Sequence, residues 1–210
     1  MVFPTLFLLL LWLVKLIEIT LDFDFSSLGI YPLRFSSLIG IFASPLLHGS
    51  LDHLMANSAT LWILFVALFY FYSPVAFKVF FFVYVATGLW VWVGGRPGFH
   101  IGASGIIYGL AAFLSVSGMI RNHIRFMALS LIVIFLYGGL LWGILPGQVG
   151  ISWESHLLGG VAGIVMAFYY RKKELSIPIP LFPDYSKMED DDGGLPWQQT
   201  MEELNQEENE

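Results

Sequence analysis

Six long apolar stretches dominate this sequence and restrict what it can fold into. A bilayer core about 30 Å thick is crossed by about 20 apolar residues at a helical rise of about 1.5 Å per residue. Stretches of this kind occupy residues 2–20, 52–72, 75–93, 100–119, 124–145 and 153–170. We therefore expect an all-α, polytopic membrane protein with six transmembrane helices.

The composition agrees with a chain whose solvent is largely hydrocarbon. Of the 210 residues, 57% are hydrophobic and 12% are charged, and the mean hydropathy is +0.73. Soluble domains have a different balance. The sequence contains no cysteine, which excludes disulfides, thiolate catalysis and cysteine metal sites. It also lacks the basic clusters expected of a protein that binds nucleic acid.

Two long segments fall outside the six stretches, besides the short loops between them. Residues 21–51 form a long and fairly apolar loop, which we expect to lie at the outer membrane interface. From about Ser176 the chain becomes Pro-rich and then acidic, a composition that buries too little surface to offset the entropy of ordering. We predict a membrane domain over residues 1–172 and a disordered cytoplasmic tail over residues 173–210.

The basic residues predict the orientation of the helices, because Lys and Arg in short loops are retained on the cytoplasmic side. Arg34 and Arg96 fall in loops on one side. Six basic residues fall on the other side, namely Lys78, Arg121, Arg125, Arg171, Lys172 and Lys173. Both termini are therefore predicted to be cytoplasmic, and the long first loop is predicted to face outward.

Lys15 and Glu18 are charged residues near the outer end of the first stretch. They are three residues apart and so share one helical face. We interpret them as an ion pair whose charges screen each other near the interface, in preference to a functional site.

Polar side chains on apolar helices are the most informative residues, since a charged one costs about 2.5–3.5 kcal/mol to bury in hydrocarbon on insertion scales. His53 and Asn57 form the first such site. They are four residues apart and project from one helical face. Taken alone, the pair is better explained as hydrogen-bonding groups between helices. The alternative is that both side chains donate to a single point.

Ser104 lies at the outer end of the fourth stretch between Gly102 and Gly105, where glycine lets another backbone approach closely. A helix start also offers unpaired N–H groups and positive potential to a developing anion. The site suits attack on a carbonyl, although a small-residue packing surface explains the same glycines. Tyr108 stands on the same face one turn deeper, either as part of this site or as an ordinary packed aromatic.

His156 begins the sixth stretch, and Gly159 and Gly163 follow it on one helical face. If this glycine stripe packs against Gly105 and the glycine one turn later, Ser104 and His156 meet within hydrogen-bond reach. The polar sites all fall toward the outer leaflet in the predicted topology. Polar residues that only join neighbouring helices need not all lie in the same leaflet.

Three segments together resemble the rhomboid proteases. They are His48-Gly49-Ser50-Leu51-Asp52-His53-Leu54-Met55-Ala56-Asn57-Ser58, then His100-Ile101-Gly102-Ala103-Ser104-Gly105-Ile106-Ile107-Tyr108-Gly109, and His156 with Gly159 and Gly163. The resemblance covers about residues 1–172, with three motifs in the family's order on three helices. One departure lies in the first loop, where many members carry a Trp-Arg pair and this sequence has Ile39-Gly40.

The resemblance implies a serine–histidine dyad without an acid, in which Ser104 attacks and His156 accepts and returns the proton. It implies that Tyr108 stacks on His156 and holds the ring. The side chains of His53 and Asn57, with the backbone N–H of Ser104, would form the oxyanion hole. His48 resembles the family's supporting histidine, which would order the first loop.

The activity implied is that of an intramembrane serine endopeptidase, which cleaves single-span transmembrane proteins near the extracytoplasmic face without a metal or other cofactor. Access from the lipid past the fifth helix is implied as well. We expect a bacterial inner membrane, because the chain has little beyond the six stretches. One alternative is a catalytically silent relative that binds membrane clients, although such relatives usually lose the serine or the histidine. A transporter is a weaker alternative, since neither several mid-membrane charges nor paired broken helices are visible.

Two further residues near the motifs are not expected to take part in catalysis. His100 immediately precedes the serine motif, and we interpret it as an interfacial residue satisfied by water. Glu154 is two residues before His156 and therefore points elsewhere along a helix. The histidines lack carboxylate partners at ligand spacing, so no zinc site is expected.

Overall fold

The computed structural model describes residues 2–147, 150–173 and 175 of the chain. Within these residues the structure has seven α-helices: α1 (Val2–Thr20), α2 (Gly40–Ala43), α3 (Leu51–Phe71), α4 (Ala76–Gly94), α5 (Ser104–Ile120), α6 (Ile124–Tyr137) and α7 (Trp153–Tyr169). Four short 3-10 helices accompany them: η1 (Phe25–Leu28), η2 (Phe35–Ser37), η3 (Ser44–Leu46) and η4 (Gly138–Ile144). The expected all-α class is confirmed. The predicted tail, residues 173–210, lies outside the described residues except for Lys173 and Leu175.

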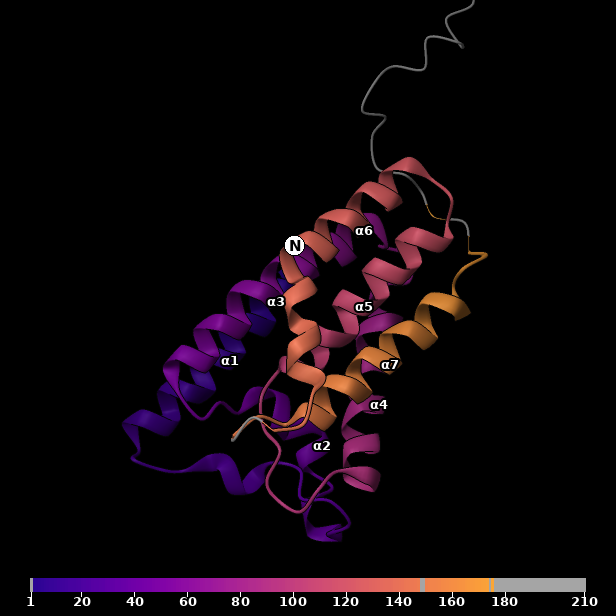
Figure 1. The fold of residues 1–210 in the computed structure, drawn as a ribbon. Coiled ribbons are helices and arrows are strands. Elements are labelled where there is room, and N and C mark those ends of the chain that lie inside the picture. Colours follow the sequence, from indigo (N-terminus) through magenta and orange to yellow (C-terminus); the bar gives the residue numbers. More distant parts are fainter. Residues whose placement is uncertain (1, 148–149, 174, 176–210) are drawn as a thin grey trace, which may run out of the picture. The chain divides into compact units, whose positions relative to one another are not determined.

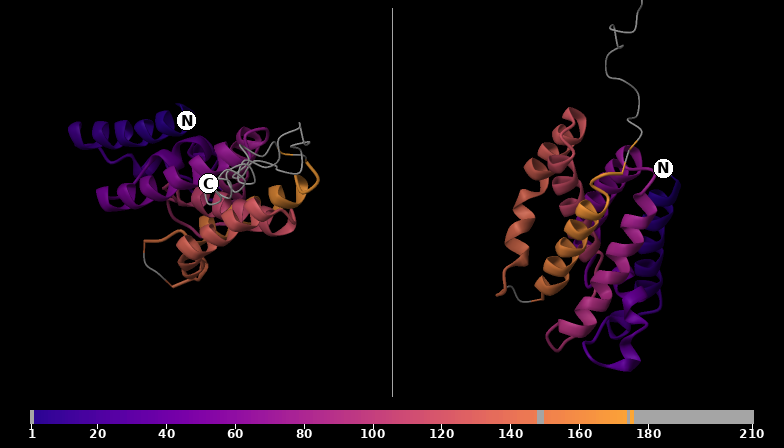
Figure 2. Two further views of the ribbon diagram at one scale, coloured as in Figure 1. Left: turned by 90° about the horizontal axis from the view of Figure 1, so that it is seen from above. Right: turned by 90° about the vertical axis from the view of Figure 1, so that its right-hand side faces the viewer.

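The long helices lie side by side along one direction, and α5 is the central one (Figures 1 and 2). It packs against α3, α4, α6 and α7, whereas α1 packs mainly on α3. Leu110, Phe113 and Leu114 of α5 are fully buried, as expected for a helix with neighbours on most of its faces. The helix that begins with Ser104 is therefore held from several sides.

Within the part of the chain that the structure describes, four segments are long and apolar enough to cross a bilayer. They are Val2–Thr20, Leu51–Phe71, Ala76–Gly94 and the segment Ile124–Ile144, which joins α6 to η4. Several of the expected membrane-spanning helices are thus present. The helices α5 and α7 are shorter, at 17 residues each.

Two of the predicted stretches differ from the observed helices by more than one residue at an end. The fourth begins at Ser104 instead of His100, because His100 pairs with Ile30 in an isolated antiparallel bridge and Gly102 has a φ of +107°. The fifth does not stay α-helical to residue 145 but changes to a 3-10 helix at Gly138. Glycines cluster in η4, and glycine weakens an α-helix by about 1 kcal/mol relative to alanine.

The first loop is folded against the end of α4 and the segment before α5. The N–H of Leu33 donates to the carbonyl of Trp92 over 2.9 Å, and the Trp92 indole donates to the carbonyl of Arg34 over 3.0 Å. Gly40 occupies part of the place where many rhomboids carry Trp-Arg, and a Cβ there would lie only 2.5 Å from the carbonyl oxygen of Gly29. A larger residue would therefore not fit this loop.

The backbones of α5 and α7 touch through two pairs of glycines. A Cβ on Gly159 would collide with the carbonyl oxygen of Gly105, and one on Gly163 would collide with that of Gly109. Only residues without a side chain permit this approach. The first turns of α5 and α7 are consequently held next to each other.

This contact makes a prediction for stability. Gly163→Val should lower the free energy of unfolding by about 1–3 kcal/mol, the usual cost of overpacking, because the new side chain collides with α5. The measurement is the thermal unfolding midpoint in detergent. Gly160→Ala is the matched control, since a Cβ at Gly160 meets no atom within 4 Å, and its midpoint should stay at or above that of the wild type. Equal midpoints for the two variants would contradict this account of the contact.

Candidate active site

Ser104 is the first residue of α5 and is presented by a sharp turn of the backbone. Gly102 has a φ of +107°, and a Cβ there would lie 2.9 Å from Cε1 of His53. The N–H of Gly102 donates to the carbonyl of Ser44 over 2.8 Å, which ties the turn to η3. As the first residue of the helix, Ser104 also presents an N–H with no acceptor in its own helix. Both the hydroxyl and this N–H belong to the same helix start.

Ser104 and His156 are hydrogen-bonded, with 2.8 Å between Oγ and Nε2. The other ring nitrogen of His156, Nδ1, lies 2.8 Å from the carbonyl oxygen of Gly143. A carbonyl can only accept a hydrogen bond, so Nδ1 carries the hydrogen and Nε2 is the acceptor for the serine hydroxyl. His156 is 8% exposed. The ring is therefore held in the tautomer that a general base for Ser104 requires.

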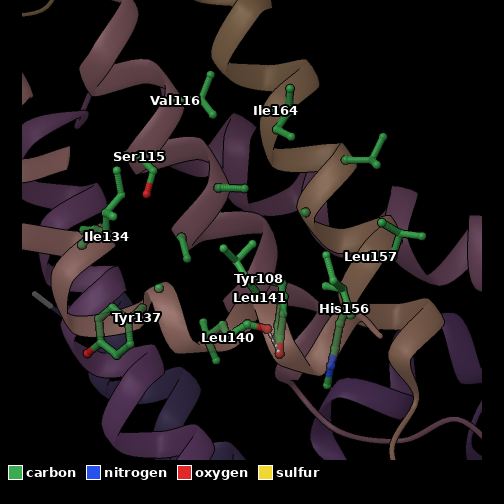
Figure 3. Close-up of a pocket in the computed structure, with 17 residues that line it drawn as sticks. Tyr108, Ser115, Val116, Ile134, Tyr137, Leu140, Leu141, His156, Leu157 and Ile164 are labelled. Atoms are coloured by element: carbon green, nitrogen blue, oxygen red, sulfur yellow. Dashed lines mark hydrogen bonds between the residues drawn. The ribbon is translucent and has the colours of Figure 1, made fainter. Parts of the chain in front are cut away.

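Tyr108 forms a wall against one face of the imidazole. Its ring is stacked on that of His156 with 4.1 Å between centroids and 8° between planes. The Tyr108 hydroxyl donates to the carbonyl of Leu140 over 2.7 Å, which links the stack to η4 (Figure 3). The stacked ring and the Gly143 carbonyl together fix the plane and the rotation of the imidazole.

The carbonyl of Gly143 is a site group that the sequence reasoning missed. The glycine-rich run at residues 138–143 was the available signal, but it was included in a continuous fifth helix. In the structure this run is the 3-10 segment η4, and it crosses the site close to His156. A main-chain oxygen leaves no mark in the sequence, because any residue carries one.

A cavity of about 500 Å³ brings the predicted residues together. Its lining includes His53 and Asn57 from α3, Ser104 and Tyr108 from α5, and His156 from α7. The volume lies in the range of ordinary ligand sites, about 300–1,000 Å³. The two polar residues of α3 thus face the same space as the serine hydroxyl.

His48 lies behind Asn57 and supports it. The residue is 2% exposed, and Nε2 of its ring lies 3.1 Å from the amide nitrogen of Asn57. Because the amide donates, Nε2 accepts, and the ring is neutral. Burial, with the nearby His53 as a lesser cause, lowers the pKa of His48 from 6.5 to about 4. The imidazole is therefore a hydrogen-bond acceptor at neutral pH.

The interpretation of His100 as satisfied by water was wrong. The residue is 5% exposed, its Nδ1 lies 2.6 Å from the Ser152 hydroxyl, and its Nε2 lies 3.0 Å from the carbonyl of Arg96. Ser152 caps α7 by accepting from the N–H of Ser155. His100 thus connects the segment before Ser104 to the start of the helix that carries His156.

Glu154 points away from the dyad, as its spacing from His156 predicts. Its Oε1 lies 3.1 Å from Nε of Arg96. The ion pair joins α7 to the loop after α4, close to the contact made by His100. This carboxylate is a partner of the loop and does not serve as the third member of a triad.

Gly143→Ala tests whether the main chain orients the imidazole. The added Cβ would collide with the Tyr108 hydroxyl and lie 3.2 Å from Nδ1 of His156. Displacing the ring should slow the reaction of Ser104 with a fluorophosphonate by about tenfold or more, since about 1.4 kcal/mol of barrier suffices. Gly139→Ala is the matched control, because its Cβ meets no atom within 4 Å. Labelling of Gly143→Ala at the wild-type rate would exclude this role.

Comparison with known proteins identifies the family. The sequence model of the rhomboid domain family matches residues 36–173 of this chain. These residues include the three motifs from His48 to Gly163. Uncharacterized proteins of Mycobacterium tuberculosis and Mycobacterium bovis are each 38% identical over 176 residues, covering 77% of this chain and 71% of the relative. An uncharacterized protein of Mycobacterium leprae is 34% identical over 178 residues, covering 77% of this chain and 68% of the relative. The chain therefore belongs to the rhomboid family, a family of intramembrane serine proteases.

Proposed function

We propose that this chain is an intramembrane serine endopeptidase that cleaves single-span transmembrane proteins near the extracytoplasmic face. Ser104 is the nucleophile, and His156 is the general base and acid. The observation that carries the proposal is the 2.8 Å hydrogen bond from the Ser104 hydroxyl to Nε2 of His156. Nε2 is free to accept the proton because Nδ1 is committed to Gly143.

The reaction follows from this arrangement. As Ser104 Oγ attacks the scissile carbonyl, its proton passes to Nε2 of His156, and the imidazolium keeps its Nδ1–H bonded to the Gly143 carbonyl. The C–N bond then breaks, and Nε2 returns the proton to the leaving amine. Water attacks the resulting acyl ester with His156 again as base, which releases the second product and restores the hydroxyl.

Three donors are positioned to stabilise the oxyanion. The N–H of Ser104 comes from the first turn of α5, and the side chains of His53 and Asn57 line the same cavity. The Asn57 amide nitrogen has two hydrogens and uses one on His48. The second remains for the cavity, where charge develops during attack.

The lengths of α5 and α7 support a site below the outer water line. Each has 17 residues and extends about 25 Å at about 1.5 Å per residue, less than a bilayer core of about 30 Å. Arg121 joins their far ends by donating to the carbonyls of Tyr170 and Lys173. With those ends level at the cytoplasmic interface, Ser104 and His156 lie within the outer leaflet.

The proposal includes six membrane spans with both termini cytoplasmic. Lys78, Arg121 and Arg125 lie at the ends of α4, α5 and α6 that face away from the dyad, as do the basic residues after α7. This distribution fits the retention of basic loops in the cytoplasm. The bacterial inner membrane is the setting we propose.

The cleaved segment must unwind locally, because an intact helix conceals its peptide bonds in its own hydrogen bonds. Substrates should therefore carry Gly, Pro or polar residues near the outer face. The resemblance to rhomboid proteases further implies a small residue before the scissile bond. Access past α6 is favoured by its position, because the 3-10 segment η4 that continues it contributes to the lining of the cavity at Ser104. Leu140 of η4 lines both the cavity at Ser104 and an apolar pocket between α5, η4 and α7 (Figure 3).

A catalytically silent protein that binds membrane clients is the second candidate. It would need the same helices and cavity, but it would not need a hydroxyl paired with an imidazole in the correct tautomer. The two candidates make opposite predictions about cleavage.

Ser104→Ala and His156→Ala should each abolish cleavage of a reporter with one transmembrane segment, because each removes one half of the dyad. The measurement is the appearance of the cleaved product in proteoliposomes, with thermal midpoints recorded to show that the variants fold. Persistent cleavage by Ser104→Ala would refute the assignment of Ser104 as the nucleophile. A wild-type chain that binds the reporter without cleaving it would favour the client-binding protein.

Asn57→Ala should lower kcat by about 10² to 10³-fold, the usual effect of losing one oxyanion donor, and should leave KM nearly unchanged. The loss should be smaller than that of Ser104→Ala, because the Ser104 N–H and His53 remain. Steady-state kinetics on the same reporter provide the comparison. A loss as complete as that of Ser104→Ala would contradict the assignment of Asn57 as one donor among several.

A further inference from the structure

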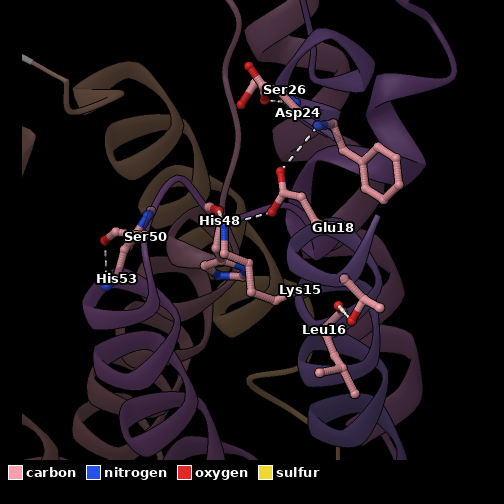
Figure 4. A network of polar contacts seen from close by, with 10 residues as sticks. Lys15, Leu16, Glu18, Asp24, Ser26, His48, Ser50 and His53 are labelled. Carbon is pink, nitrogen blue, oxygen red and sulfur yellow. Dashed lines mark hydrogen bonds and ion pairs between the residues drawn. The ribbon is translucent and has the colours of Figure 1, made fainter. Parts of the chain in front are cut away.

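Lys15 and Glu18 form a polar network between α1 and the first loop (Figure 4). Lys15 Nζ lies 2.6 Å from Oε2 of Glu18 and 2.9 Å from the carbonyl oxygen of His48. The two side chains are only 12% and 13% exposed. The pair therefore does more than screen its own charges, and the earlier interpretation from spacing alone was incomplete.

The pair holds the first loop near both of its ends. Glu18 Oε1 accepts from the backbone N–H of Phe25 over 3.1 Å, near the start of the loop. Lys15 donates to His48, two residues before the N-cap of α3. Since Glu18 also fixes the Lys15 ammonium, the position of the His48 backbone depends on both charges.

The network continues from His48 to the site. Lys15 bonds the carbonyl of His48, and the ring of the same residue accepts the amide of Asn57 over 3.1 Å. A shift of the His48 backbone would move this acceptor. The Asn57 amide would then rotate, and the second hydrogen that it directs toward the cavity would move with it.

Apolar packing does not account for the outer half of α1. The buried side chains of this helix are Pro4, Phe7 and Leu11, all in its first half. Beyond them the contacts with α3 and the loop are polar, from Trp12 to Ser58 and from Lys15 to His48. Ion pairs removed from water contribute little net stability. The contacts of this pair with the Phe25 N–H and the His48 carbonyl instead point to a role in positioning the loop.

We propose that Lys15 and Glu18 are positioning residues for the oxyanion donor Asn57, acting through His48. The inference rests on the proposed protease function. Helix α1 then contributes to catalysis without contacting Ser104. His48 and Asn57 lie between Lys15 and the cavity at Ser104. Loss of either charge frees the His48 carbonyl and misaligns the Asn57 amide.

The first experiment is a double-mutant cycle on the reporter substrate. Lys15→Met should lower kcat by about tenfold with KM within about twofold, because a donor to the transition state is misaligned. In an Asn57→Ala background the same substitution should cause no further loss, since the group it orients is gone. Lys15→Arg, which keeps donors for both partners, should retain most of the wild-type kcat. An equal fold loss from Lys15→Met in both backgrounds would overturn the proposal.

Arg121→Met is the matched control at the opposite end of the helices. Arg121 also makes half-buried polar contacts, to Ser117 and to the carbonyl of Tyr170, so its loss should lower the thermal midpoint. The control should keep the wild-type kcat. If kcat instead falls in proportion to the thermal midpoint in both Lys15→Met and Arg121→Met, Lys15 has a purely structural role.

The second experiment needs no catalysis. The chain has four asparagines, Asn57, Asn122, Asn205 and Asn209, so NMR of protein labelled with ¹⁵N-asparagine resolves few side-chain amides. Asn57→Ala assigns the resonance of Asn57. Lys15→Met and Glu18→Gln should shift this resonance, and Arg121→Met should not. An unmoved Asn57 signal would overturn the proposal, whereas a wild-type chain that never cleaves would refute the protease function alone.

Discussion

Gly159 rests on the carbonyl of Gly105, and Gly163 rests on that of Gly109, so that α5 and α7 lie closer together than any side chain would allow. Ser104 and His156 belong to the first turns of these two helices. The separation of the hydroxyl and the imidazole is therefore set by contact between backbones, which cannot be compressed or repacked as side chains can. The polar ties of His100 and Arg96 then fix the start of α7 relative to the segment before Ser104.

A dyad without a carboxylate requires another means of holding the imidazole. Here the Gly143 carbonyl selects the tautomer, and the Tyr108 ring supports the plane. Both groups are uncharged, which suits the proposed position of the site within the membrane, where an unpaired carboxylate is costly to bury. The one carboxylate close in sequence, Glu154, is directed to Arg96 in the loop after α4. Both the orientation of the imidazole and the cost of burying a charge therefore favour uncharged groups around His156.

The sequence was sufficient for the features that depend on periodicity and length. Apolar length located the helices, and the spacing of Gly159 and Gly163 after His156 pointed to the contact that brings α5 and α7 together. It was insufficient for contacts made by main-chain atoms and by loops. The Gly143 carbonyl lies in a 3-10 segment whose apolar residues look helical. His100 and Lys15 bond residues 52 and 33 positions away, and no local pattern encodes such partners.

The proposed catalysis depends most directly on activation of the Ser104 hydroxyl by His156. Peptide mapping by mass spectrometry after reaction of the membrane-embedded protein with a fluorophosphonate tests this claim at a single atom. One adduct is expected, on the peptide that contains Ser104, and it should be absent in the folded His156→Ala variant. An adduct on a different serine, or labelling of Ser104 that persists without His156, would contradict it.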